Sequence, residues 1–365
     1  MPSLPAPGSI YEIGDFELAS RLSFFLWSRL PDEELLDLAE QGRLKDPEVL
    51  AAQVQRMLAD PKAESLVTNF AAQWLDIRGV TGIAPDPVLF PEFNPNLGRA
   101  FAKELELFLK SVLLEDRSVL DLLTADHSFV NERLALHYGI ADVRGDAFRR
   151  IKLEDENRWG LFGKGGILLA TSYPNRTAPV LRGAWILEAI TGTPPAAPPP
   201  NVEAFPENEE GVEAKTVRER LEMHRENPTC NACHGVMDPL GFALENFDAI
   251  GQWRTKDREA ATPIDSSGQL ADGTIVNGPV DLREALLERP DHIAQTLTEK
   301  LLIYALGRGV EYYDMPAVRE IVRDAAREDY RFSAILTGIV TSEPFRMGQT
   351  ASEEGEVAAQ ASLQR

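Results

Sequence analysis

The stretch from Asn227 to His234 reads Asn227-Pro-Thr-Cys230-Asn-Ala-Cys233-His234, and it contains the only two cysteines of a 365-residue chain. Two cysteines spaced Cys-x-x-Cys and followed directly by histidine form the attachment signature of c-type haem. Thiols one helical turn apart can each bond a vinyl group of one porphyrin, and the adjacent imidazole can reach the iron. Asn227 and Pro228 suit the N-cap and first turn of a helix. The stretch therefore predicts a helix carrying one covalent haem c, attached at Cys230 and Cys233, with His234 as proximal ligand.

Two other kinds of site share this cysteine spacing. A zinc site would need two more ligands from His224, His234 or distant carboxylates, and the sequence offers no second Cys-x-x-Cys and no His-x-x-x-His pair. A thioredoxin-like dithiol would need a strand before the motif, whereas Lys215 to Asn227 has the pattern of a polar helix. A structural or interaction module that holds zinc or no cofactor stays an alternative to haem.

The residues after the motif predict a haem environment. Asp238-Pro239 should end the haem helix, because a proline disfavours helical geometry in the residue before it. Phe242 and Phe247 then offer an apolar wall against a porphyrin face. An arginine could pair with a haem propionate. The candidates for that pairing are Arg254, Arg182 and Arg176.

The sequence leaves the sixth iron ligand open. A distal methionine or histidine would make an electron-transfer site, while an open position would permit peroxide or oxygen chemistry. Met237 is only three residues beyond His234 on the same helix, so it cannot easily cross to the opposite face. Met315 and His292 are the leading distal candidates because they lie far enough along the chain to return over the haem. Residues that could line the distal side are Tyr304 and Arg308, and Met347 is a further ligand candidate.

Composition places the chain among folded globular proteins. It is 44% hydrophobic, and its length is enough to bury more than one core. The formal net charge is -21, with acidic residues mixed among basic ones, which indicates an acidic surface. No basic face is evident, so no nucleic-acid partner is expected. An acidic surface could steer a basic redox partner protein toward the haem.

The sequence bears on location in two ways. No apolar run approaches the roughly 18 residues of a membrane span. The N-terminus, Met1-Pro-Ser-Leu-Pro-Ala-Pro-Gly, has neither the basic start nor the apolar stretch of a secretory signal. Haem c is normally attached outside the bacterial cytoplasm. We therefore expect a periplasmic or cell-surface protein, of which this chain is a fragment or mature form, or else a motif that is never loaded.

Helical periodicity dominates the chain and predicts a mainly α, multi-module protein with a cytochrome c-like haem-binding region. Leu50, Val54 and Leu58, for example, fall on one helical face. The turn residues in 265–268 and 271–278 flank short strands and predict one small β-hairpin. The predicted order is an extended tail at 1–14, an all-helical module at 15–142, a haem c-binding module at 157–256, a mostly helical module at 264–347 and a disordered tail at 348–365.

Two histidines lie outside the haem module. His127 and His137 occur in the first module near the ends of short predicted helices. We expect each to be a surface or capping histidine rather than a metal ligand.

Four stretches of sequence, one of them containing the cysteine motif, carry a resemblance to a known family. They read Phe24-Phe-Leu-Trp-Ser-Arg-Leu-Pro-Asp-Glu-Glu-Leu-Leu, Phe129-Val-Asn-Glu-Arg-Leu-Ala-Leu-His-Tyr-Gly, Cys230-Asn-Ala-Cys-His-Gly-Val-Met-Asp-Pro-Leu-Gly-Phe-Ala-Leu-Glu-Asn-Phe-Asp and Leu301-Leu-Ile-Tyr-Ala-Leu-Gly-Arg. Together they resemble the planctomycete-type cytochrome c proteins, built from the domain-of-unknown-function families 1592, 1588 and 1585. The resemblance spans about Asp15 to Met347. It implies a haem-bearing protein whose reaction is largely unassigned, and it leaves open a second haem in the intact protein.

These observations favour one function and keep two others open. The favoured function is a c-type cytochrome that transfers electrons outside the cytoplasm through a single haem c. One alternative is a haem enzyme of peroxidase or oxidase type with an open distal site, so whether the protein is an enzyme stays undecided. The other is the zinc-bearing or cofactor-free module.

Overall fold

The computed structural model describes residues 9–197 and 215–349, and within these ranges the chain forms sixteen α-helices. The strands of the described ranges form three separate two-stranded antiparallel sheets. The predicted mainly α fold with a small β-hairpin is therefore confirmed. Most of the two predicted tails lies outside the described residues, but residues 9–14 and 348–349 are described.

Contacts divide the chain into two compact units, Met1–Leu66 together with Thr298–Arg365, and Val67–Leu297. The first unit thus joins segments from both ends of the sequence. Its link is the antiparallel pair of β1 (Ile10–Glu12) and β6 (Met347–Gln349), in which Tyr11 lies opposite Gly348. These units cut across the three modules expected from sequence order, whose boundaries stay a prediction.

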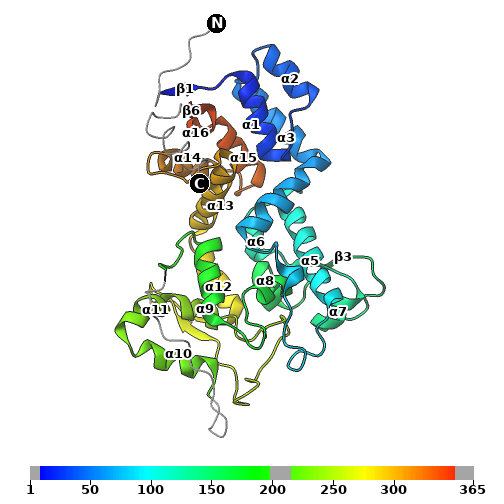
Figure 1. Ribbon diagram of the computed structural model, residues 1–365, viewed down its shortest axis with the longest axis vertical. Coiled ribbons are helices and arrows are strands. Elements are labelled where there is room, and N and C mark those ends of the chain that lie inside the picture. Colours follow the sequence, from blue (N-terminus) through cyan, green and yellow to red (C-terminus); the bar gives the residue numbers. More distant parts are fainter. Residues whose placement is uncertain (1–8, 198–214, 350–365) are drawn as a thin grey trace, which may run out of the picture. The chain divides into compact units, whose positions relative to one another are not determined.

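The first unit is a set of helices around a core of aliphatic and aromatic side chains. Figure 1 shows α1, α2 and α3 in blue and α14 to α16 in orange and red. Its helices are α1 (Asp15–Trp27), α2 (Glu33–Glu40), α3 (Pro47–Ala59), α14 (Met315–Ala326), α15 (Phe332–Thr341) and α16 (Glu343–Arg346). The predicted stripe of Leu50, Val54 and Leu58 on α3 is buried, and α3 packs against α15.

The second unit contains the cysteine motif. Its longer helices are α5 (Pro95–Leu113), α7 (Glu132–Tyr138), α8 (Gly165–Ala170), α9 (Pro179–Trp185), α10 (Val217–Arg225), α11 (Pro228–Phe242) and α12 (Gly278–Leu287). The short helices α4 (Ala72–Trp74) and α6 (Asp121–Thr124) join them, and α13 (Pro290–Leu306) begins in this unit and ends in the first. Phe101 on α5 packs with Leu134 on α7 and Leu169 on α8 in a common core.

The predicted hairpin is present in the second unit as β4 (Ser267–Gln269) paired antiparallel with β5 (Ile275–Asn277). A further antiparallel pair, which the sequence analysis did not predict, joins β2 (His127–Val130) to β3 (Arg149–Lys152). Both pairs are short, so the helices supply most of the core.

The expectation that His127 and His137 are surface or capping residues is wrong, because both side chains are buried. Nε2 of His127 lies 2.8 Å from Oγ of Ser111, and Nε2 of His137 lies 2.8 Å from the carbonyl oxygen of Ile250. Burial disfavours the charged imidazolium and lowers the pKa of each histidine to about 4. Both histidines are therefore neutral core residues at pH 7.

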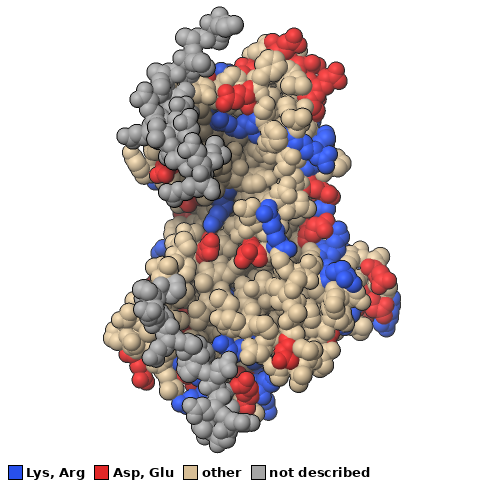
Figure 2. Space-filling view, viewed as in Figure 1, with Lys and Arg blue, Asp and Glu red and all other residues tan. Residues whose placement is uncertain are grey.

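Charged side chains of both signs lie on the described surface. Figure 2 shows acidic and basic side chains interspersed on one face rather than gathered into one basic patch. Among the helices of the described ranges, none has both the length and the apolar character that crossing a membrane requires.

Candidate functional site

The motif occupies the first turns of α11. Asn227 is the N-cap, and its side chain accepts a hydrogen bond of 2.9 Å from the backbone N–H of Thr229, with Pro228 in the first turn. Cys230 and Cys233 are both partly exposed and are not joined in a disulfide. Because residues three apart lie on one helical face, the two thiols are presented together at the solvent-facing start of α11.

The second half of α11 is buried, in contrast to the first. Residues 237–242 are all buried, and α11 packs on α9 through glycines. A Cβ atom built on Gly183 would overlap the carbonyl oxygen of Met237, and one built on Gly241 would overlap that of Pro179. The absence of side chains at these two positions lets the helix backbones approach closely.

The prediction that Asp238-Pro239 ends the helix is wrong, because α11 continues through Pro239 to Phe242. A proline inside a helix removes one backbone hydrogen bond and disfavours helical geometry before it. Here the glycine contacts with α9 hold this turn in place on both sides of the proline. Tertiary packing therefore overrides the local preference.

The continued helix brings Asp238 one turn beyond His234. Nδ1 of His234 lies 3.0 Å from Oδ1 of Asp238. A carboxylate accepts hydrogen bonds, so this contact favours the tautomer in which Nδ1 carries the proton and Nε2 keeps its lone pair. The His234 side chain is 20% exposed, whereas Asp238 is completely buried. The contact with Asp238 therefore fixes the orientation of the His234 ring and leaves Nε2 available to bind a metal ion.

Helix α10 supplies the rest of the surroundings of Asp238 and His234. Its N-terminus is a capping box, in which Thr216 and Glu219 bond each other's backbone N–H groups. In its last turn, Nε of Arg225 lies 3.6 Å from Oδ2 of Asp238. The ring of His224 lies nearly perpendicular to that of His234, with 4.9 Å between the ring centroids.

These residues fit a covalent haem. Two unbridged thiols stand one turn apart at an exposed helix start, and the adjacent histidine offers Nε2 while Nδ1 is engaged by a buried carboxylate. Metal-bound histidines characteristically donate the other ring N–H to such a partner. The zinc alternative has weaker geometric support, since the described parts of the chain hold no group of three or more His, Cys, Asp or Glu side chains suited to a metal ion.

The two predicted wall residues lie in the protein core. Phe242 is buried between α10 and α11 against Val217 and Leu221. The guanidinium of Arg218 covers the Phe242 ring at 4.0 Å from its centroid. Phe247 is completely buried and meets the ring of Trp253 edge-on at 5.1 Å. A contact of either phenylalanine with haem stays a prediction.

The predicted propionate partner Arg182 is completely buried, and the structure gives it other partners. Its guanidinium donates to the carbonyl oxygens of Leu244, Phe247 and Asp248 at 2.7, 2.8 and 2.8 Å, and it lies 3.3 Å from Oε1 of Glu245. Burial lowers the pKa of Arg182 to about 10, so it stays charged at pH 7. The hydrogen bonds of Arg182 therefore stabilise the loop after α11. Its pairing with a haem propionate stays a prediction.

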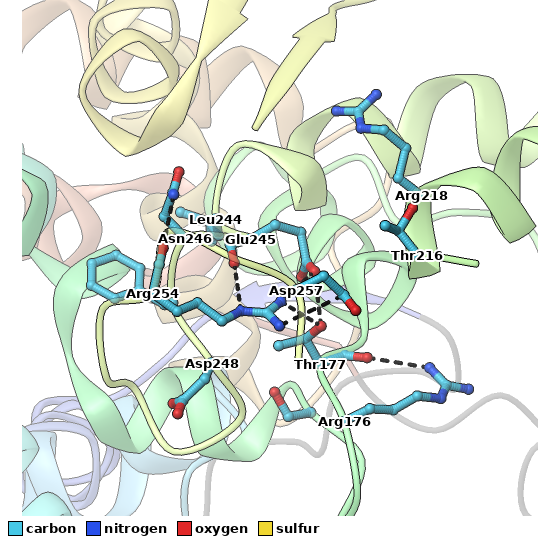
Figure 3. A network of polar contacts seen from close by, with 12 residues as sticks. Arg176, Thr177, Thr216, Arg218, Leu244, Glu245, Asn246, Asp248, Arg254 and Asp257 are labelled. Carbon is cyan, nitrogen blue, oxygen red and sulfur yellow. Dashed lines mark hydrogen bonds and ion pairs between the residues drawn. The ribbon is translucent and has the colours of Figure 1, made fainter. Parts of the chain in front are cut away.

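Arg254 lies in the same polar network, which Figure 3 shows from close by. Its guanidinium points between Glu245, at 2.9 Å from Oε2, and Thr177, at 3.3 Å from Oγ1. Arg176 lies at the edge of this network, donates to the carbonyl oxygen of Thr177 at 3.2 Å and covers the ring of Tyr173. A cavity of about 400 Å³ borders the network. Five cationic side chains line it, namely Arg176, Arg220, Arg254, Lys256 and Arg258, together with the acidic Asp248, Asp257 and Glu259.

Of the predicted distal residues, His292 alone lies in the same compact unit as the motif. His292 is exposed near the start of α13. Met315 begins α14, and Met347 begins β6, both in the other compact unit.

The two residues predicted to line the distal side have other partners. Tyr304 shares a hydrogen bond of 3.0 Å with Ser28, and Arg308 forms a two-point ion pair with Asp314 at 2.6 and 2.9 Å. The distal ligand stays a prediction.

Sequence reasoning missed Asp238 as a site residue. Its spacing from His234 is four residues, which on a helix places two side chains next to each other. That signal was outweighed by the expectation that the helix stops at the proline. Arg225 was missed as well, because its contact with Asp238 depends on how α10 folds back on α11.

Three family models match the chain in succession. Each describes a protein of unknown function: the first (DUF1592) matches residues 13–140, the second (DUF1588) residues 158–257 and the third (DUF1585) residues 272–345. The second match contains α10, α11 and the whole cysteine motif. No curated protein and no solved structure matches the chain significantly. The chain belongs to the planctomycete-type cytochrome c proteins, which are built from these three domain families.

Proposed function

We propose that this protein binds one haem c covalently and transfers electrons. Cys230 and Cys233 would form the two thioether bonds, and Nε2 of His234 would bind the iron. The observation that carries the proposal is the pairing of His234 with the buried Asp238 at 3.0 Å, next to two partly exposed thiols. Bound haem supplies a one-electron iron couple.

The chain's own residues would act on that couple in three ways. The thiols at the solvent-facing start of α11 would hold the haem covalently. Asp238 would accept a hydrogen bond from Nδ1–H, which would leave Nε2 available to the iron. The glycine contacts of α9 with α11 fix the backbone that carries both. A haem attached at the solvent-facing start of a closely packed helix would suit electron exchange between proteins.

The proposed haem c, together with the net charge, predicts the cellular location and the kind of redox partner. Haem c attachment outside the cytoplasm would place the protein in the periplasm or at the cell surface. The net charge of -21 would favour a redox partner protein with a basic surface, since opposite charges accelerate association at low salt.

A second candidate function is a haem enzyme of peroxidase or oxidase type. It is favoured by the same Asp238 carboxylate, because a charged hydrogen-bond acceptor raises the basicity of the ligating histidine. A more basic proximal ligand donates more electron density to iron, which assists cleavage of a bound peroxide. This activity would also need an open distal position.

The experiment is expression with an added signal peptide in cells that mature c-type cytochromes. We expect sharp absorbance bands on dithionite reduction and haem that stays attached after denaturation. A low-spin spectrum unchanged by carbon monoxide would indicate electron transfer, and carbon monoxide binding would indicate the enzyme. The Cys230→Ala/Cys233→Ala variant is the matched control and should lose covalent haem. Well-folded wild-type protein without covalent haem would contradict the proposal.

A further inference from the structure

The line of contacts from His234 through Asp238 to Arg225 has a consequence for the haem itself. We propose that Asp238 is a positioning residue that fixes the Nδ1–H form of His234 and gives the haem a low reduction potential, and that Arg225 limits this effect. The inference rests on the proposed haem binding. It concerns the reduction potential of the haem, which covalent attachment alone does not determine.

The first step concerns the charge on Asp238. Its side chain is completely buried, and Oδ2 has no hydrogen-bond partner within the described residues. Nε of the Arg225 guanidinium lies 3.6 Å from Oδ2, which is longer than a hydrogen bond. A buried carboxylate with one oxygen left unbonded is a strong acceptor through the other. Its strongest available partner is Nδ1–H of His234 at 3.0 Å.

The second step concerns the iron. A strong acceptor at Nδ1 raises the basicity of Nε2. A more basic ligand, next to a buried negative charge, stabilises the ferric state more than the ferrous state, because the ferric state carries one more positive charge. The reduction potential should therefore be lower than with a neutral acceptor in the same place.

The third step concerns Arg225. Its Nε lies 3.6 Å from Oδ2 of Asp238, its guanidinium carbon lies 5.7 Å from the centroid of the Phe242 ring, and its Nη2 lies 3.9 Å from Oε1 of Glu222. It is one-fifth exposed. A cation in this place offsets part of the Asp238 charge, so its removal should shift the potential in the opposite direction to removal of the carboxylate.

The backbone supports this arrangement. Gly183 on α9 abuts the carbonyl group of Met237, directly before Asp238. The position of the carboxylate is thus set by packing between two helices rather than by a mobile loop, as a positioning residue requires.

One test needs no haem. In haem-free protein labelled with ¹⁵N-histidine, the side-chain nitrogen shifts report which ring nitrogen carries the proton. The chain has five histidines, and the His234→Gln variant assigns the signal. We expect the Nδ1–H form for His234 in the wild type and a mixture of forms in Asp238→Ala. An Nε2–H form in the wild type would overturn the positioning role.

The second test is a redox titration of haem-loaded protein. Asp238→Asn keeps the shape and removes the charge, and it should favour the reduced state at least tenfold, an upward shift of about 59 mV for one electron. Arg225→Gln should shift the potential downward. The matched controls are Glu219→Gln and Arg218→Gln, which make the same charge changes on α10 at residues whose side chains contact neither Asp238 nor Arg225. Each control should shift the potential by less than its counterpart.

The outcomes separate the two proposals. Absence of covalent haem from the wild-type protein would contradict the proposed function. Haem-loaded Asp238→Asn with an unchanged potential would overturn the inference while leaving the cytochrome in place. A shift of equal size in Arg218→Gln and Arg225→Gln would remove the specific role of Arg225.

Discussion

Gly183 on α9 lies directly against the carbonyl group of Met237 on α11, with no room for a side chain between the two helices. This contact holds the turn of α11 that carries Asp238, and through it the ring of His234.

The first prediction tests this contact. Gly183→Ala would force its methyl group into a backbone oxygen, so α9 and α11 would have to separate. We expect a loss of about 1–3 kcal/mol in the free energy of unfolding, measured by urea denaturation of the haem-free protein. Gly235→Ala is the control, because its Cβ would meet only the flexible end of Asn231 at 3.1 Å. Equal effects of both changes would contradict the role of the contact.

The second prediction concerns Arg182. Replacing it by methionine would remove one of the two arginines paired with the buried Glu245, leaving Arg254 as the other, and would remove the charged donor shared by three carbonyl oxygens. We expect a loss of about 3–5 kcal/mol in the free energy of unfolding. Lysine should not restore it, because one ammonium cannot reproduce the fork of a guanidinium. The measurement is urea denaturation of the haem-free variants.

The control for Arg182 is Arg176→Gln, at the edge of the same network, with an expected change of about 0.5 kcal/mol or less. If Arg182 served mainly as a propionate partner, Arg182→Met would instead leave the haem-free protein stable and alter only the haem-loaded form.

The third prediction is a dependence of stability on pH. The pKa of the buried His137 is about 4 in the folded protein and about 6.5 when unfolded. Between these values the unfolded chain binds more protons, so the free energy of unfolding falls as pH falls from 6.5 to 4. The full effect of His137 is about 3 kcal/mol. His127, whose pKa is also lowered to about 4, acts in the same direction.

This dependence can be measured as the urea midpoint at pH 7.0, 6.0 and 5.0. The variant His137→Gln should show a shallower decrease than the wild type. A midpoint independent of pH in the wild type would show that neither histidine is held neutral by folding.

The fourth prediction concerns zinc. Protein made in the cytoplasm, where haem c is not attached, should purify with far less than one zinc per chain, since the described residues provide no cluster of three ligands. Metal analysis by mass spectrometry measures this directly. One zinc per chain, lost in Cys230→Ser but retained in Asp257→Asn, would support the zinc-bearing module instead.

Local sequence accounted for the start of the site. Asn227, Pro228 and the spacing of Cys230 and Cys233 specify a capped helix with two thiols on one face, and these are interactions between residues close in sequence. The same reasoning recovered the helical stripe of α3 and the hairpin of β4 and β5, since periodicity and turn chemistry are local properties.

Local sequence misjudged the residues whose environment comes from distant segments. The histidines His127 and His137 were expected at the surface or as helix caps because they lie near the ends of short predicted helices, but their ring nitrogens contact Ser111 and Ile250 within the core. The pairing of β1 with β6 joins segments more than 300 residues apart, and no periodicity reports such a contact.

The sequence by itself determined that this chain is mainly helical and that Cys230, Cys233 and His234 stand together at the start of one helix, because helix caps and spacings of three and four residues act within a single turn. Only the tertiary structure decided that α11 runs on through Pro239 and that Asp238 is buried behind His234 beside Arg225. The physical reason is that α9 meets α11 at Gly183 and Gly241, where close packing outweighs the local cost of a proline within a helix.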